Sequence, residues 1–347
     1  MSLAAIELND AAVALARDGE LLSESPGFAL MEEGTLLIGD DARRRARLEP
    51  RSVSTRFWSR LSNDPVSPAT PAGVTFADLA REHVSSVWAS AGEGVDGVIL
   101  AVPGSFERAQ LGLLLGIAEQ LSLPVCGLVD SALAACRSPA GKGLVVHVDV
   151  HLHGAVITGI EASQTFRRIF AHDIEGHGLV QLYDEWITLI AELFVQTTRF
   201  DPLHRAQSEQ AIYDRLPLWL STLVAQTSMG IEMEARDGGV HVIRLMRERV
   251  VECARDFYAR LTADIGELCS GRPFALQLSH GAARLPGLAA ALQPAADGPA
   301  VTLPAGAGAL GALERAAGVA DADWQNTLTL SLPRDVIAAH GTVETTR

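Results

Sequence analysis

The hydrophobic and polar positions at the start of the chain predict three consecutive strands. Residues 3–8, 11–17 and 20–25 are mainly apolar or alternate between apolar and polar positions. The pair Asp18-Gly19 between the last two segments is a hairpin signal. The first part of the chain is therefore predicted to form a β-meander.

A helix, and then alternating strands and helices, are predicted after this meander. Apolar positions recur at helical spacing behind Thr75, which is a suitable N-cap for a helix over residues 75–91. The next segments are predicted to be a strand, a helix, a strand and a helix, at residues 96–103, 105–121, 123–129 and 130–136. Such alternation predicts parallel strands joined by crossover helices.

The same order begins again after residue 143. Three successive strands are predicted at residues 144–150, 154–160 and 164–172. The pattern then predicts two long helices at about residues 179–200 and 207–229, a hairpin at 230–244 and a third long helix at 247–269. A strand at 274–279, a helix from 286 onward, a strand at 300–304 and a final helix at 309–318 are predicted to follow. A meander followed by βα units thus occurs twice, which predicts an α/β fold with an internal repeat.

Composition agrees with this class and excludes some partners. The 347 residues are 48% hydrophobic and only 5% aromatic, which suits α/β layers better than an aromatic-rich sandwich. The length allows two or three domain-sized units. A formal net charge of -14 argues against nucleic acid as a partner, since phosphate binding needs a concentrated basic face. The arginines between residues 43 and 47 are predicted to lie on the solvated face of a helix.

The cysteines and the N-terminal segment predict a soluble, cytoplasmic protein. The four cysteines lie in apolar stretches without metal-type CxxC spacing, which predicts small buried residues in a reducing compartment. The apolar run at the N-terminus has no basic leader and is interrupted by Glu7 and Asp10. Neither a signal peptide nor a membrane span is expected there, and no membrane partner is expected.

Several segments resemble, in the right order, the ATPase domain of the 70-kDa heat-shock chaperones. Residues 36–62 are similar to the family's run G-x-x-A followed by N-P and a helix. In residues 97–136 a strand ends in Val102-Pro103 and an F-x-x-A-Q helix begins at Phe106, as in the family. Residues 276–288 resemble the family's adenosine loop V-G-G-x-x-R-x-P.

The resemblance implies an actin-like ATPase fold with two lobes, that is, duplicated ribonuclease-H-like domains with mixed sheets and flanking helices. The first lobe is expected at residues 1–140, with an inserted subdomain at about 28–94. The second is expected at residues 141–320, with a helical subdomain at about 179–244, and residues 321–347 are expected to be a C-terminal tail. The β-rich peptide-binding domain of the chaperones is not expected in this chain.

A nucleotide site of this family holds phosphates in two glycine-rich turns, whose backbone N–H groups approach closely. The first turn, D-L-G-T-T in the family, is Glu7-Leu8-Asn9-Asp10-Ala11 here. A carboxylate survives as Glu7, but the glycine and both threonines are replaced. Asn9 is still expected to allow a left-handed turn, though less readily than glycine.

The second turn, D-L-G-G-G-T in the family, is here Asp149-Val150 followed by His151, Leu152, His153 and Gly154. The larger side chains are expected to keep phosphates away from the backbone. Protonation of both histidines below about pH 6.5 is expected to strengthen triphosphate binding.

Other positions of the resemblance are partly replaced. Asp130 stands where the family has a Glu that orients water, and the catalytic lysine falls near Trp58 or Ser59. The catalytic residues that the resemblance implies are Glu7, Asp130 and Asp149. The cofactor-binding residues that it implies are Asn9, Asp10, His151, His153, Gly154, Ser228, Gly281 and Arg284. The implied cofactor is ATP or ADP with Mg²⁺, bound weakly.

A histidine-rich segment and a glycine motif can each be interpreted either as a functional site or as ordinary structure. His147, Asp149, His151 and His153 recur at period two, with His172, Glu175 and His177 nearby, and such a set could ligate a divalent metal. The same pattern is typical of solvent-facing positions near a hairpin tip, and no metal ligand is predicted. The glycines of G-x-G-x-x-G at residues 306–311 lack a following βαβ unit and are predicted to serve helix packing.

These observations favour a chaperone-like actin-fold protein that acts as a weak or degenerate ATP/ADP-binding interaction module with an unidentified protein partner. One alternative is an active Mg-dependent ATPase of the chaperone family. A second is a metal-binding protein that uses the histidine-rich turn at residues 147–153. Whether the chain is an enzyme stays open, because hydrolysis is implied only by resemblance and most catalytic positions are replaced.

Overall fold

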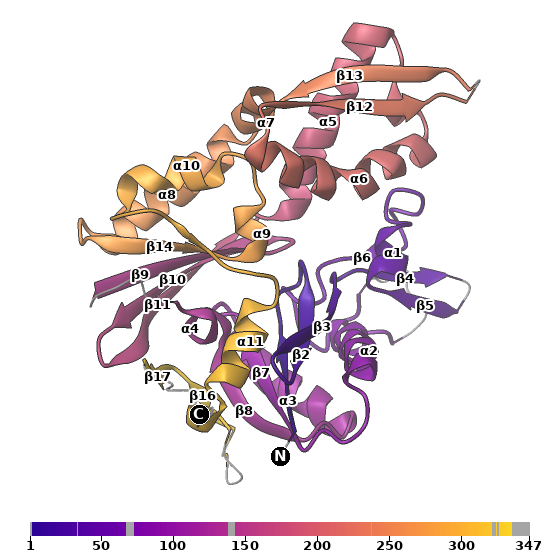
Figure 1. Cartoon of the computed structure of the whole chain (residues 1–347). Coiled ribbons are helices and arrows are strands. Elements are labelled where there is room, and N and C mark those ends of the chain that lie inside the picture. Colours follow the sequence, from indigo (N-terminus) through magenta and orange to yellow (C-terminus); the bar gives the residue numbers. More distant parts are fainter. Residues whose placement is uncertain are drawn as a thin grey trace, which may run out of the picture.

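The computed structural model describes residues 2–32, 34–66, 73–137, 143–236, 238–320, 324 and 326–334. Within these residues, two six-stranded sheets and two smaller sheets are flanked by helices (Figure 1). The predicted α/β class with mixed sheets is therefore confirmed.

The first large sheet contains the N-terminal meander and has the strand order β16-β8-β7-β1-β2-β3. Its strands are β1 (Leu3–Glu7), β2 (Val13–Arg17), β3 (Glu20–Ser25), β7 (Gly97–Val102), β8 (Val125–Asp130) and β16 (Leu328–Thr329). The three meander strands pair antiparallel, whereas β1, β7, β8 and β16 pair parallel. Every position of β7 is buried, as expected of a central strand covered on both faces.

The second large sheet has the order β15-β14-β9-β10-β11-β17. Its strands are β9 (Gly143–Val150), β10 (Gly154–Ala162), β11 (Thr165–Glu175), β14 (Phe274–Leu278), β15 (Val301–Thr302) and β17 (Ser331–Pro333). In both sheets the first strand of a three-strand meander pairs parallel with the strand of that sheet that follows the meander in sequence, β7 or β14. The carboxyl ends of β1 and β9 consequently occupy equivalent places in the two sheets.

The helices of the first half cover the first sheet. They are α2 (Phe76–Trp88), α3 (Arg108–Gln120) and α4 (Ser131–Ala135). Helix α2 begins at the predicted N-cap, where the side chain of Thr75 accepts from the N–H of Asp78 at 3.1 Å and the Asp78 carboxylate accepts from the N–H of Thr75 at 2.9 Å. Its apolar face packs on Ile6 and Leu15 in the core of this half.

The arginine-rich segment differs from its prediction. It belongs to a small sheet of β4 (Ala29–Glu32), β5 (Thr35–Ile38) and β6 (Val53–Ser54) with a short helix α1 (Asp40–Arg43). The helix ends at Arg43, so no arginine-covered helical face forms. Arg45 instead pairs with Glu32 and Glu49, and Arg47 reaches acids of the second half. Arg45 and Arg47 therefore lie in ion pairs and not on a solvated helical face.

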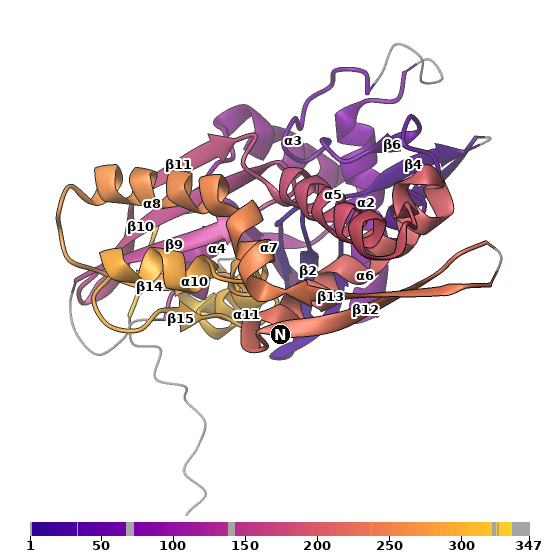
Figure 2. The ribbon, with the colours of Figure 1, turned by 90° about the horizontal axis from the view of Figure 1, so that it is seen from above.

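The second half carries a helical region above its sheet. Its elements are α5 (Leu179–Thr198), α6 (Ala206–Ala225), β12 (Ser228–Glu234), β13 (Val240–Met246), α7 (Arg247–Cys253), α8 (Arg255–Cys269), α9 (His280–Ala283) and α10 (Leu288–Leu292). The single long helix predicted for residues 247–269 is divided at Ala254. Seen from above, α8 and α10 lie over the second sheet, and the β12–β13 hairpin projects from the body (Figure 2).

Helix α11 (Ala307–Glu314) contains the glycine motif and packs on α4. A Cβ added at Gly311 would collide with the carbonyl oxygen of Ala134, and one at Gly308 would lie 2.6 Å from the carboxyl carbon of Glu7. The prediction that these glycines serve close packing is confirmed. The remaining short 3₁₀ segments are Ala89–Ala91, Pro202–His204, Gln293–Ala295 and Ala316–Gly318.

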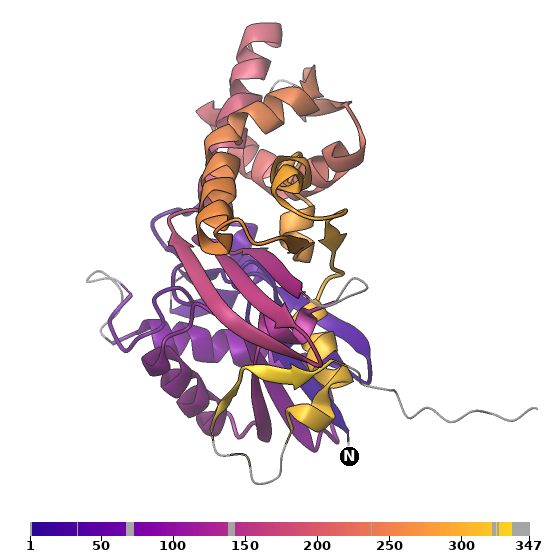
Figure 3. The ribbon, with the colours of Figure 1, turned by 90° about the vertical axis from the view of Figure 1, so that its left-hand side faces the viewer.

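The segment expected to be a C-terminal tail contributes to both sheets. β16 extends the first sheet beside β8, and β17, two residues later, extends the second beside β11 (Figure 3). Leu332 of β17 is fully buried. This short segment therefore connects the edges of the two sheets.

Burial agrees with the prediction for three cysteines, since Cys126, Cys136 and Cys269 are buried, whereas Cys253 is only half-buried. Within the described ranges, no helix combines the length and the apolar character needed to cross a membrane.

Candidate ligand-binding cleft

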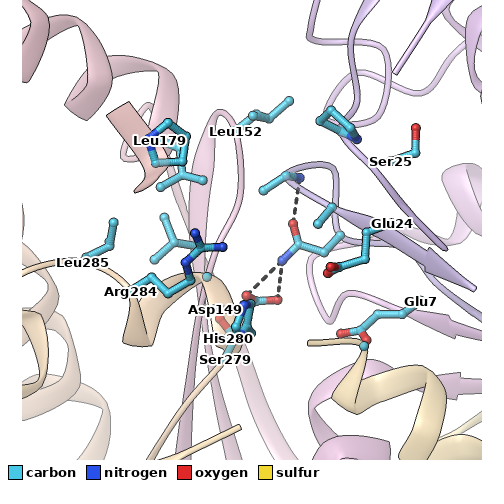
Figure 4. Close-up of a pocket in the computed structure, with 18 of the residues that line it drawn as sticks. Glu7, Glu24, Ser25, Asp149, Leu152, Leu179, Ser279, His280, Arg284 and Leu285 are labelled. Atoms are coloured by element: carbon cyan, nitrogen blue, oxygen red, sulfur yellow. Dashed lines mark hydrogen bonds between the residues drawn. The ribbon is translucent and has the colours of Figure 1, made fainter. Parts of the chain in front are cut away.

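A cavity of about 440 Å³ lies where the ends of β1, β3 and β9 meet the helical region of the second half. Its volume is in the range of small-molecule sites. Figure 4 shows Glu7 and Glu24 on one side of this cleft, with Asp149, His280 and Arg284 on the other. Apolar and aromatic side chains also line it, namely Phe28, Leu152, Leu179, Tyr183, Tyr213 and Leu285. The cleft therefore combines charged side chains with an apolar and aromatic lining.

The two turns predicted to hold phosphates are joined directly. The side-chain nitrogen Nδ2 of Asn9 donates to both carboxylate oxygens of Asp149, each at 2.9 Å (Figure 4, dashed lines). The Asn9 Oδ1 atom accepts from the N–H of Ala11 at 2.8 Å. The turn is shaped by this side-chain bond, and Asn9 does not adopt the left-handed conformation that the sequence suggested.

A second link joins the same turns. The Asp10 carboxylate accepts from the backbone N–H of Leu152 at 2.7 Å, and Nδ1 of His151 lies 3.3 Å from the same oxygen. On its other side, Nε2 of His151 lies 3.5 Å from Asp149. Asp10 and His151 are both more than nine-tenths buried. The two residues form a buried ion pair at the junction of the halves.

The two histidines of the second turn have opposite pKa shifts. Burial opposes protonation of His151, but Asp149, Asp10 and Asp173 outweigh it and raise its pKa to about 9. Burial, followed by the nearby Arg56, lowers the pKa of His153. The expected gain of positive charge near pH 6.5 is therefore wrong for His151, which is already charged at neutral pH and matched by carboxylates.

Glu7 is held at the beginning of α11. Its Oε2 atom accepts from the N–H groups of Gly308 and Ala309 at 2.8 and 3.2 Å. Burial, and then the charge of Asp149, raise the pKa of Glu7 to about 7 despite these bonds. Glu7 thus lines the cleft as a carboxyl group that changes charge near neutral pH.

Asp130 lies away from the cleft. It is fully buried, accepts from the N–H of Leu133 at 2.9 Å as the N-cap of α4, and pairs with Arg168 at 2.7 Å. It does not line the cleft. These bonds give Asp130 a structural role, and no free oxygen is directed toward the cleft.

Gly281 and Arg284 do line the cleft, because α9 begins at the end of β14 beside β9. The Arg284 side chain points toward the centre of the pocket in Figure 4. Its guanidinium has no hydrogen bond or ion pair within the described part of the chain. Ser228, by contrast, begins β12 and lines neither cavity.

His153 and Gly154 belong to a second cavity, of about 360 Å³, on the other side of the two turns. Nε2 of His153 lies 2.8 Å from the hydroxyl of Thr55. Trp58, where the resemblance places a lysine, is 3% exposed, and its indole N–H donates to His83 at 2.9 Å. A buried hydrogen bond is therefore found where the chaperone family has a lysine.

Histidines of the set that could ligate a metal have separate partners. His147 lies 3.0 Å from the amide nitrogen of Gln277, His172 lies 3.7 Å from Asp264, and His177 stacks on a phenylalanine of α8. Across the described ranges, no group of three His, Cys, Asp or Glu side chains is arranged to hold a metal ion.

The contacts of Arg47 with Tyr213, Asp184, Glu209 and Gln210 form a roof over the cleft that the sequence did not predict. The ring of Tyr213 lies under the guanidinium of Arg47 at 4.5 Å, and Arg47 also pairs with Asp184 and, at 3.5 Å, with Glu209. The buried side chain of Gln210 accepts from the N–H of Arg47 at 2.7 Å. These contacts join the arginine segment to α5 and α6. The density of arginines was the available signal, but Asp184, a partner of Arg47, lies 137 residues away along the chain.

Comparison with known proteins adds no family to this geometry. A scan against models of protein families finds no match, and a search of curated proteins finds none either. Function is therefore inferred from the residues of the cleft.

Proposed function

We propose that this chain is a two-lobed, actin-like protein related to the ATPase domain of the 70-kDa heat-shock chaperones, and that it acts as a nucleoside-responsive interaction module. Two observations support the architecture: five strands follow the same order in both large sheets, β8-β7-β1-β2-β3 and β15-β14-β9-β10-β11, and a cavity lies between the sheets. The ends of β1 and β9 and the loop at Gly281 and Arg284 meet in this cavity, as the resemblance requires.

Arg284 carries the proposal. A guanidinium without a protein partner, beside Leu285 and Leu179 in an apolar wall, can stack on the face of a purine. This contact needs no phosphate. The nucleoside half of a nucleotide therefore fits the cleft.

The phosphate half fits poorly. The N–H of Leu152 is already bonded to Asp10, and the Asp149 carboxylate is bonded to Asn9. Each charge-assisted phosphate contact that is lost costs on the order of 1.5–3 kcal/mol. Two or three such losses weaken Mg·ATP binding by several powers of ten. We therefore propose no efficient hydrolysis.

The roof connects ligand binding in the cleft to the outer surface of the protein. A ligand that contacts Tyr213 in the cleft touches the residue on which Arg47 rests, so binding favours the contacts of Arg47 with α5 and α6. A protein partner that recognises this outer surface would detect the occupied cleft.

Calorimetry with adenosine, ADP and Mg·ATP tests the proposal at about pH 8. Adenosine and ADP are expected to bind within about threefold of ATP. Arg284→Ala should weaken all three about 3- to 30-fold, as expected for loss of a cation–π contact. Arg272→Ala, an exposed arginine that does not line the cleft, is the matched control and should change nothing.

Two outcomes contradict the proposal. A sub-micromolar dissociation constant for ATP, a strong preference for ATP over ADP and adenosine, and measurable turnover would favour an active ATPase instead. Absence of binding for all three compounds would exclude a nucleoside ligand, and elemental analysis of the purified protein would then test the metal-binding alternative.

A further inference from the structure

The turn after β9 contains two donors that point to one place. The backbone N–H of Leu152 and the imidazole Nδ1 of His151 both face the Oδ1 atom of Asp10, at 2.7 and 3.3 Å. Asp10 is separated from Leu152 by 142 residues, so this contact is purely tertiary. A fixed N–H beside a cationic ring is the usual arrangement for binding an oxyanion.

The surroundings of this turn also suit an anion. The second cavity opens against it, and Arg56 and Arg60 line that cavity without an ion pair inside the described ranges. The Nε2 atom of His151, which is buried, has no hydrogen bond. Acids also line the cavity, namely Asp173 and Glu175. Neither of these accepts a hydrogen bond from the turn, which distinguishes them from Asp10.

We propose that Asp10 is an internal substitute for an oxyanion, which fills the binding position formed by Leu152 and His151 and thereby makes the native chain reject phosphate groups there. Asp10 is a specificity-determining residue in this view. An internal carboxylate is held in place by the fold and has no association entropy to lose, so a free anion at millimolar concentration does not displace it. Its negative charge also repels an approaching phosphate.

This inference rests on the proposed function, because it explains why the phosphate half of a nucleotide is excluded, but Asp10 and His151 line the second cavity and not the cleft. The two can fail separately. Adenosine tests Arg284, whereas inorganic phosphate and tripolyphosphate, which contain no nucleoside, test Asp10. The shared chemistry is that of a tetrahedral oxyanion.

The test is Asp10→Ser, studied by calorimetry with inorganic phosphate and with tripolyphosphate at constant ionic strength. The substitution removes the carboxylate and leaves a small polar group that does not fill its place. We expect tripolyphosphate to bind at least 30-fold more tightly than to the native chain. Asp173→Asn is the matched control, since it removes one negative charge from the same cavity without freeing a donor, and its gain should be under threefold.

A folding control keeps the result decisive. If Asp10→Ser does not fold in chloride buffer, it is refolded in phosphate at equal ionic strength beside Asp10→Asn, which retains an acceptor for the N–H of Leu152. We expect phosphate to restore the Ser variant specifically, seen as a rise in melting temperature that chloride does not produce. Equal gains in Asp10→Ser and Asp173→Asn, or failure of phosphate to restore the Ser variant while Asp10→Asn folds, would overturn the proposal.

Discussion

The side-chain amide of Asn9 lies 2.9 Å from both carboxylate oxygens of Asp149 and so connects the end of one large sheet to the end of the other. The two residues are 140 positions apart. With the contact of Asp10 to Leu152, this bond closes the base of the cleft from within the chain. A site that separates strand ends to admit phosphates must break these links first.

Removing the amide of Asn9 should loosen the base of the cleft. Asn9→Ala leaves the Asp149 carboxylate without two bonds in a buried place, and we expect a loss of about 1.5–3 kcal/mol in the free energy of unfolding. Denaturant unfolding measures it. Asn63→Ala, on an exposed asparagine, should change stability by less than about 0.5 kcal/mol, and an equal loss in both variants would contradict the assigned link.

His151 should make the protein less stable in alkaline solution. Its pKa is about 9 in the folded state because Asp149, Asp10 and Asp173 face it, against about 6.5 when unfolded. A raised pKa gives a contribution that is complete below about pH 6.5 and is lost as pH rises through about 9. We expect a fall on the order of 2–3 kcal/mol over that range, which His151→Gln should abolish.

The control for this pH dependence is His204→Gln, because His204 is exposed in a short 3₁₀ segment. It should retain the native slope of unfolding free energy against pH. A slope that persists in His151→Gln would show that another group is responsible.

Arg47 should hold the roof closed. Arg47→Ala removes the stacking on Tyr213 and the pairs with Asp184 and Glu209, which are partly exposed, so the expected loss of stability is about 1–2 kcal/mol. Amide hydrogen exchange should increase in α6 and in residues 40–54. Arg44→Ala, whose side chain is 61% exposed and pairs with Asp41, should leave exchange in α6 unchanged.

The packing of α11 on α4 should not tolerate a methyl group. Gly311→Ala places a Cβ against the carbonyl oxygen of Ala134, and we expect a loss of about 1–3 kcal/mol or failure to fold. Gly266→Ala, inside α8 with open space around it, should instead stabilise the protein by about 0.5–1 kcal/mol. Thermal unfolding of the two variants measures whether each substitution lowers or raises stability. A stable Gly311→Ala protein would disprove the close contact.

Local pattern alone determined many of the elements. The buried strand at 97–102 and the helix that begins behind Thr75 were predicted because apolar periodicity and a capping box act over a few residues. The repeated order of meander and parallel strands followed from the same signals. Glu7, Asn9 and Asp149 were placed together in the cleft by resemblance, and the structure brings them to one cavity.

The tertiary structure decided what these residues contact. Sequence placed Asp10 and His151 in separate turns as ligand-binding groups, but the way the two sheets meet brings them together as a buried ion pair. Arg47 was expected in solvent, yet its partners lie on helices more than 130 residues away. Hydrogen bonds and ion pairs depend on distances of a few ångströms between segments remote in the chain, and apolar periodicity contains no information about such distances.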